Sequence, residues 1–181
     1  MRSRALARLA SVACLLALAP ALAAAAPPKR RAAHPARTVD QFVARAAGRS
    51  LAGIELSDLA LQRSGDASVR RLARRAHDEH VHTYDTLLGV ATGAGISAAP
   101  PETIDLEQRA IKSRLSALHG AAFDRAYVEA LRANDERDIA LYRSFAAATK
   151  DEALKAWVAE QLATIRRRRQ LIAGTAREIG G

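Results

Sequence analysis

The feature that most constrains this chain is a series of long segments with helical apolar periodicity, separated by only a few short breaks. Apolar residues recur at three- and four-residue intervals in each segment, which is the pattern of an amphipathic helix. Composition agrees, because the chain is rich in Ala, Leu and Arg and poor in aromatic residues. The predicted long helices run from Thr38 to Ser64-Gly65, from Asp66 to about Ala94, from Ala121 to about Ala148 and from Asp151 to about Ile179.

The connection between the second and third long helices is much longer than the other two. Gly95 and Pro100-Pro101 end the second helix, and Thr103 is the predicted cap of a shorter helix that ends at His119-Gly120. Short connections on either side predict two helical hairpins. The sequence therefore predicts an all-α, ferritin-like four-helix bundle with a long crossover carrying a short extra helix between the second and third long helices.

The first 26 residues have the pattern of a secretory signal peptide. Three arginines form a basic start, and the apolar run Leu9–Ala19 is too short to span a bilayer. Pro20 breaks this run, and Ala21-Leu22-Ala23 follows as a cleavage motif of small residues. We expect cleavage after Ala23 to Ala25, and no transmembrane segment after processing.

Residues 27–37 are predicted to be a basic Pro/Ala linker, and residues 38–181 the helical-bundle domain. Residues 1–37 hold seven Lys or Arg and no acid, whereas the other 144 residues carry 21 basic and 19 acidic groups. A nearly neutral domain argues against nucleic acid as a partner. The basic tail predicts at most weak contact with anionic envelope components. The only cysteine, Cys14, lies in the signal peptide, so the mature chain forms no disulfide.

The segment 74–85, RRAHDEHVHTYD, contains three histidines and raises the question of a metal site. A helix turns about 100° per residue, which places His80 in the middle of the apolar stripe and His77 about 60° to one side. Asp78 and His82 point to the opposite face and are predicted to pair in solvent at i,i+4. The three histidines therefore cannot bind one ion together.

Polar residues on the other predicted helices fall on the stripes that face His80. The last helix carries Arg168 beside its stripe, and the first offers Arg49 but no acid. In antiparallel third and fourth helices Asp135 lies about one turn from Arg168, so we expect Arg168 to pair with Asp135 or Asp138, with His80 hydrogen-bonded nearby. The predicted structural polar layer comprises His80, Asn134, Asp135, Asp138 and Arg168.

A metal site is the alternative interpretation of the same layer. Its candidate ligands are His80, His77, Asp135 and Asp138, and its candidate metals are iron, manganese and zinc. A di-iron site in a bundle needs about four carboxylates and two histidines, which these helices do not supply. We therefore expect no cofactor.

Four stretches of the sequence, within residues 38–178, carry a family resemblance. They are QFVARAAGRSLAGIELSDLALQRS, VRRLARRAHDEHVHTYDTL, LHGAAFDRAYVEALRANDERDIALYRSF and LKAWVAEQLATIRRRRQLI. The most specific element is Gly-x-x-Phe-Asp-x-x-Tyr, formed by Gly120, Phe123, Asp124 and Tyr127. The chain resembles the bacterial family of exported ferritin-like proteins labelled domain of unknown function 4142.

This resemblance implies a polar pattern of one glutamate on the first helix and one histidine on each of the other three. Only His80 matches it. The corresponding positions hold Gly53, Asp135 and Arg168. The resemblance therefore implies the fold, and the family label names no reaction.

The sequence leaves three functions open. The favoured one is an exported, non-enzymatic helical-bundle protein, periplasmic or secreted, in or near the cell envelope. The second is a metal-binding or oxidoreductase-like ferritin relative that uses His80 with Asp135 or Asp138. The third is a protein held to anionic lipid by its basic tail. No Ser-His-Asp order, phosphate loop or Cys-His zinc pattern is visible in the sequence.

Overall fold

The computed structural model describes residues 39–96, 99 and 101–180, which all belong to one compact unit. The predicted signal peptide, its cleavage site and the basic linker lie outside the described residues, as does Thr38, where the first helix was predicted to start. Within the described part the chain forms five helices, α1 (Val39–Arg63), α2 (Ala67–Gly93), α3 (Leu106–Ser116), α4 (Gly120–Ala148) and α5 (Glu152–Glu178). The predicted all-helical bundle is confirmed.

Aspartates begin three of these helices. The Asp66 side chain accepts hydrogen bonds from the backbone N–H groups of the first turn of α2, and Asp105 and Asp151 do the same for α3 and α5. Such caps satisfy donors that have no partner within the helix. The predicted cap Thr103 is wrong, because α3 begins two residues later and Asp105 supplies the cap.

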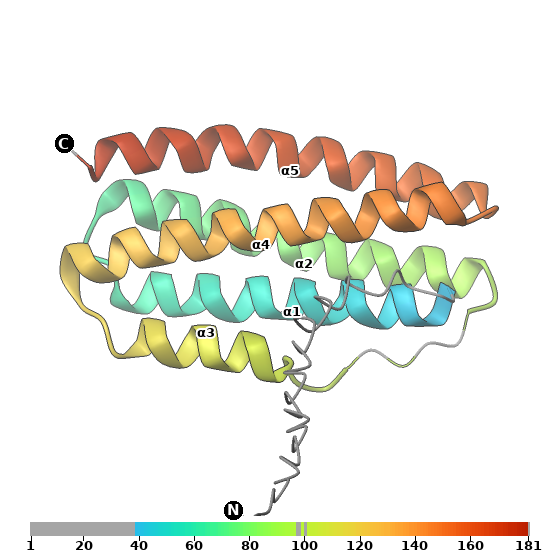
Figure 1. Cartoon of the computed structure of the whole chain (residues 1–181), viewed down its shortest axis with the longest axis horizontal. Coiled ribbons are helices and arrows are strands. Elements are labelled where there is room, and N and C mark those ends of the chain that lie inside the picture. The colour runs from blue at the N-terminus through green and yellow to red at the C-terminus, as the bar shows by residue number, and fades with distance from the viewer. Residues whose placement is uncertain (1–38, 97–98, 100, 181) are drawn as a thin grey trace, which may run out of the picture. The chain divides into compact units, whose positions relative to one another are not determined.

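Neighbouring long helices run antiparallel around the bundle (Figure 1). The hairpins α1–α2 and α4–α5 are joined by short turns, and α1 also packs on α4 while α2 packs on α5. The long connection returns the chain to the start of α4, and α3 on this connection packs on α1 and α4. Each long helix thus faces two others across a common core.

The core is divided into two apolar clusters. One lies toward the α1–α2 turn and includes Leu56, Leu72, Phe123 and Leu131, with Ile111 and Leu115 from α3. The other lies toward the α4–α5 turn and gathers Phe42, Tyr142, Phe145 and Trp157. Buried polar side chains lie between them. This polar layer in the middle of the bundle is the candidate site.

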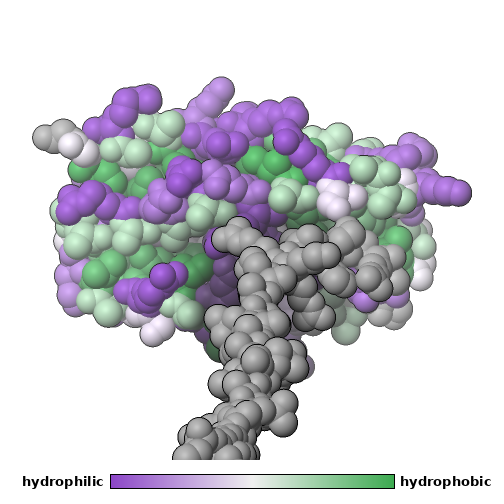
Figure 2. Space-filling model, in the orientation of Figure 1, coloured by the Kyte–Doolittle hydropathy of each residue, from purple (hydrophilic) through white to green (hydrophobic). Residues whose placement is uncertain are grey.

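On the face shown in Figure 2, hydrophilic side chains and apolar areas are interspersed. None of the helices in the described part of the chain combines the length and the apolar character needed to cross a membrane.

Candidate functional site

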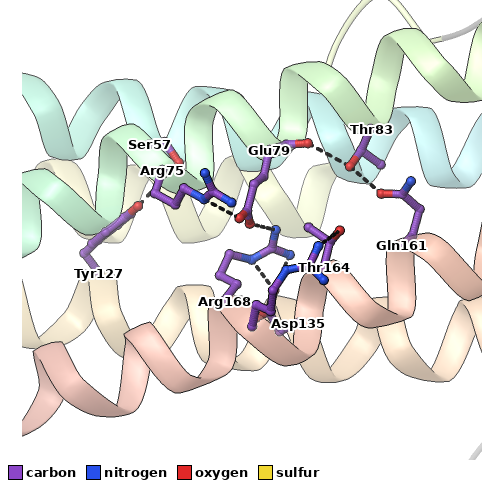
Figure 3. Close-up of polar contacts among 10 residues, drawn as sticks. Ser57, Arg75, Glu79, Thr83, Tyr127, Asp135, Gln161, Thr164 and Arg168 are labelled. Carbon is purple, nitrogen blue, oxygen red and sulfur yellow. Dashed lines mark hydrogen bonds and ion pairs between the residues drawn. The ribbon is translucent and has the colours of Figure 1, made fainter.

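A guanidinium group lies at the centre of the bundle. Arg168 on α5 is 2% exposed. It donates from Nε and Nη2 to Oδ1 of Asp135 on α4, at 2.9 and 2.5 Å, and from Nη1 to Oε2 of Glu79 on α2, at 3.1 Å. Figure 3 shows Arg168 between the two carboxylates. One cation therefore joins three helices, and the predicted contact between Arg168 and Asp135 is present.

Glu79 connects this buried group to the surface. Its second carboxylate oxygen accepts a 2.6 Å hydrogen bond from Nε of Arg75, one turn earlier on α2. The Arg75 side chain is 57% exposed, whereas that of Glu79 is 7% exposed. Glu79 therefore has two cationic partners. Among the described residues, Asp135 accepts from Arg168 alone, through Oδ1, and its Oδ2 is buried without a partner.

A second ion pair joins α1 to α4. Arg49 donates from Nε to Asp138 and from Nη2 to the backbone carbonyl oxygen of Asn134, the latter at 2.9 Å. Asn134 also exchanges weak side-chain hydrogen bonds with Gln108 of α3. Asp138 is thus held by Arg49, and the alternative pairing of Asp138 with Arg168 is wrong. In all, three arginines balance three carboxylates here: Arg49, Arg75 and Arg168 with Glu79, Asp135 and Asp138.

His80 fills the space that Gly53 leaves on α1. A Cβ atom built on Gly53 would lie closer than 3.0 Å to three atoms of the imidazole ring. Glycine within a helix costs roughly 0.5–1 kcal/mol relative to alanine, so close approach is the physical reason for a glycine here. The predicted hydrogen bond of His80 is wrong for Nε2, which is buried without a partner among the described residues.

A small polar cavity of about 10 Å³ lies beside His80, between α2, α4 and α5. On its wall the Thr83 hydroxyl lies 2.7 Å from the Glu79 carbonyl oxygen and 2.8 Å from Oε1 of Gln161. Nε2 of Gln161, like that of His80, is buried without a partner in the described part of the chain. The cavity has the size of about one water molecule.

Burial and neighbouring charges shift the pKa values of the layer. Burial raises the pKa of Asp135 to about 6, although Arg168 acts in the opposite direction. Burial, with Arg168 and Arg49 nearby, lowers the pKa of His80 well below its ordinary value of 6.5. Burial lowers the pKa of Arg168, but the contact with Asp135 outweighs it and the net shift is upward. At neutral pH the layer therefore contains a neutral imidazole among ion pairs.

The metal-binding alternative can be compared with this geometry. His80, Asp135 and Asp138 lie in the layer, whereas His77 contacts Asp58 and Asp78 nearer the surface. Oδ1 of Asp135 and Oδ1 of Asp138 each accept from a guanidinium group, and these two cations beside the carboxylates would repel a metal ion. Within residues 39–96, 99 and 101–180 no three His, Cys, Asp or Glu side chains form a group that could hold a metal ion. The four candidate ligands therefore do not fit a common metal site.

The Phe-Asp-x-x-Tyr part of the family motif lies outside the layer and joins helices. Asp124 accepts a 2.5 Å hydrogen bond from Ser64 at the end of α1, and the Tyr127 hydroxyl lies 3.3 Å from that of Ser57. Burial raises the pKa of Tyr127 to about 12. These contacts fix α4 against the C-terminal half of α1.

The sequence analysis missed Glu79 and the pairing of Arg49. Glu79 lies about 100° from His80 on the helical wheel, outside the apolar stripe, and becomes buried because Arg168 reaches it from α5. A usable signal was the Arg75/Glu79 spacing of i,i+4. The structure gives no pair between Asp78 and His82; Asp78 lies 3.1 Å from His77 instead.

Comparisons with known proteins give one family and one fold relative. Residues 24–173 match the family described as a domain of unknown function (DUF4142). No curated protein matches the chain. A crystal structure of a DUF305 protein from Streptomyces coelicolor, named as secreted, is similar with a TM-score of 0.65 and 15% identity, covering 78% of this chain and 92% of that one. This likeness concerns the fold.

Proposed function

This chain belongs to the family described as a domain of unknown function (DUF4142), and from that premise we propose that it is an exported, non-enzymatic helical-bundle protein of the bacterial periplasm or cell envelope. Two separate arguments support the proposal. One concerns what the polar layer does, and the other concerns the N-terminal sequence.

The observation that carries the non-enzymatic role is the internal pairing of the polar layer. Arg168 is 2% exposed, and its guanidinium group is committed to Asp135 and Glu79. Asp138 is committed to Arg49 in the same way. A general acid or base must reach a substrate, and these groups reach one another instead. The layer therefore serves to align four helices.

The N-terminal sequence supports export. Three arginines, an eleven-residue apolar run and an Ala-x-Ala element precede the family domain in the order of a secretory signal. A mature chain without cysteine suits an oxidising compartment, because it cannot form unwanted disulfides.

Intact-mass spectrometry of protein from an envelope fraction tests export. The expected product begins at Ala24, Ala25 or Ala26. A chain that keeps Met1, or one lipidated at Cys14, would contradict a soluble periplasmic protein.

Elemental analysis tests the structural role of the layer. After dialysis, the mature protein should retain far less than one iron, manganese or zinc per chain, because Arg168 and Arg49 already neutralise the carboxylates. About one or two ions per chain, lost in His80→Ala, would instead support a metal-binding or oxidoreductase-like protein that uses His80 with Asp135 or Asp138.

A further inference from the structure

An apolar groove lies between α3 and α4, away from the polar layer. Its volume is about 370 Å³. Figure 2 shows green surface where α3 lies below α4, with purple side chains beside it. The apolar lining consists of Ile111, Leu115 and Leu118 from the α3 side and Ala126, Ala130 and Ala133 from α4.

The groove follows from the sequence of the two helices. Positions 126, 130 and 133 lie on one face of α4, at helical spacing, and each holds alanine. These short side chains leave space opposite the branched residues of α3. Ile111 and Leu115 are buried at the base of the groove, whereas Leu118 is partly exposed.

The charges around the groove leave one cation uncompensated. Arg137 pairs with Glu107 at 2.9 Å, and Glu129 accepts a 2.6 Å bond from Arg132. The remaining charged group of the lining is Arg114, whose exposed guanidinium has no ionic partner among the described residues. An anion is therefore the complementary occupant of this end of the groove.

The volume decides which kind of anion fits. It falls within the range of roughly 300–1,000 Å³ that is typical of small-molecule sites. An α-helix of about 10 Å diameter would fit only about one turn into 370 Å³, which is too little for a docked protein segment. An apolar wall with one cation at its edge that has no ionic partner among the described residues matches a slender amphiphile.

We propose that this groove binds one fatty acid of about the length of laurate, with its acyl chain along the alanines of α4 and its carboxylate on Arg114. Burial of the acyl chain supplies most of the binding free energy, because each methylene removed from water adds to it. The carboxylate sets the orientation of the ligand. This site does not depend on the polar layer or on the proposed role of the bundle.

Titration calorimetry of the mature protein with laurate, below its micelle concentration, tests the site. The expected result is saturable binding of one laurate per chain. Dodecyltrimethylammonium, which has the same chain length and a cationic head, should bind more weakly, because it faces Arg114. Absence of saturable laurate binding, or equal binding of the two compounds, would overturn the proposal.

Three variants locate the ligand. Arg114→Gln should weaken laurate binding by up to about five-fold, as expected for an exposed ion pair. Ala130→Phe should abolish binding by filling the groove. Arg166→Gln, which removes the same charge from an exposed position on α5, should leave binding unchanged.

A thermal unfolding curve for Ala130→Phe shows whether that variant is folded, and backbone amide shifts of the unmodified protein give a second reading. Laurate should shift amides of α3 and of residues 126–137. Amide shifts confined to other helices would overturn the proposal. So would laurate affinity that is unchanged in both Arg114→Gln and Ala130→Phe.

Discussion

The aromatic end of the bundle and its polar middle hold the same four helices together by different forces. At the aromatic end Phe42 stacks on Phe145 with ring centroids 3.6 Å apart, and Trp157 meets Phe42 edge-on at 6.2 Å. In the middle Arg168 is held by directed bonds to two carboxylates. Apolar contact tolerates any partner of suitable volume, whereas a buried ion requires its own counter-ion. The two regions should therefore fail in different ways.

A large loss of stability is expected for a substitution at the aromatic end, comparable to that for the buried arginine. Phe42→Ala removes a fully buried ring that contacts three other rings, and should lower the free energy of unfolding by about 3–5 kcal/mol. Urea unfolding at low and high salt measures this loss. Because no charge is involved, the loss should be the same at both salt concentrations, and a strong salt dependence would contradict the comparison.

Gly53→Ala should break the contact between α1 and the polar middle. The added methyl group collides with the His80 ring, and overpacking of this kind costs about 1–3 kcal/mol. The matched control is Gly89→Ala on α2, where nothing lies within 4 Å of the new atom. This control should be stabilised by roughly 0.5–1 kcal/mol, because alanine favours the helix.

The double variant Gly53→Ala/His80→Ala sharpens the same test. Removing the ring should give the added methyl group room, so the cost of Gly53→Ala should largely disappear in the His80→Ala background. An undiminished cost would mean that the ring is not what Gly53 accommodates.

The pH dependence of stability should distinguish the polar middle. Because the pKa of His80 is lower in the folded state, the unfolded state binds more protons below pH 6.5, and folding loses stability as the pH falls. Asp135 has the opposite effect. Its pKa is raised to about 6 in the folded state, so the folded state binds more protons than the unfolded state between about pH 4 and 6, and it gains stability as the pH falls through that range.

Removing the imidazole should remove the first of these effects. As the pH falls from 6.5 to 5.5, the free energy of unfolding of His80→Gln should rise by about 1 kcal/mol relative to that of the wild type. The reason is that the variant has no histidine that must stay neutral in the folded state. Chemical unfolding at a series of pH values measures the difference, with His82→Gln on the exposed face of α2 as the control. Parallel curves for His80→Gln and wild type would contradict a buried neutral His80.

The smallest effect is expected for an ion pair at the surface. Arg71 and Glu178 lie 3.3 Å apart between α2 and α5, with more than half of each side chain exposed. Arg71→Gln should change stability by less than about 1 kcal/mol, and salt should reduce even that. A loss comparable to that of a buried partner would remove the distinction between surface and layer.

Local signals in the sequence were sufficient to locate the helices and to predict which residues of one hairpin lie at the same height along the bundle. Apolar periodicity and Gly/Pro breaks located all five helices, and the antiparallel hairpin placed Asp135 one turn from Arg168, where the structure has them in contact. Both follow from geometry within a single helix or across a short turn. The cap of α3 was misplaced because Thr103 and Asp105 are both good caps.

Contacts between hairpins could not be predicted in the same way. Whether Arg168 reaches Glu79, and whether Arg49 rather than Arg168 holds Asp138, depends on how α1 and α2 pack on α4 and α5. Apolar periodicity within each helix does not determine how the two hairpins pack on each other. That Nε2 of His80 lacks a partner among the described residues could not be predicted either, because the cavity beside it is formed by three helices.

A double-mutant cycle between Arg168 and Asp135 tests the central claim most directly, namely that a buried ion pair holds the middle of the bundle. Arg168→Met alone should lower the free energy of unfolding by about 3–5 kcal/mol, because it leaves Asp135 buried without its cation. Adding Asp135→Leu should restore much of that loss. Adding Asp138→Leu should not, because Asp138 is paired with Arg49. Purely additive losses for Arg168→Met and Asp135→Leu would contradict the account.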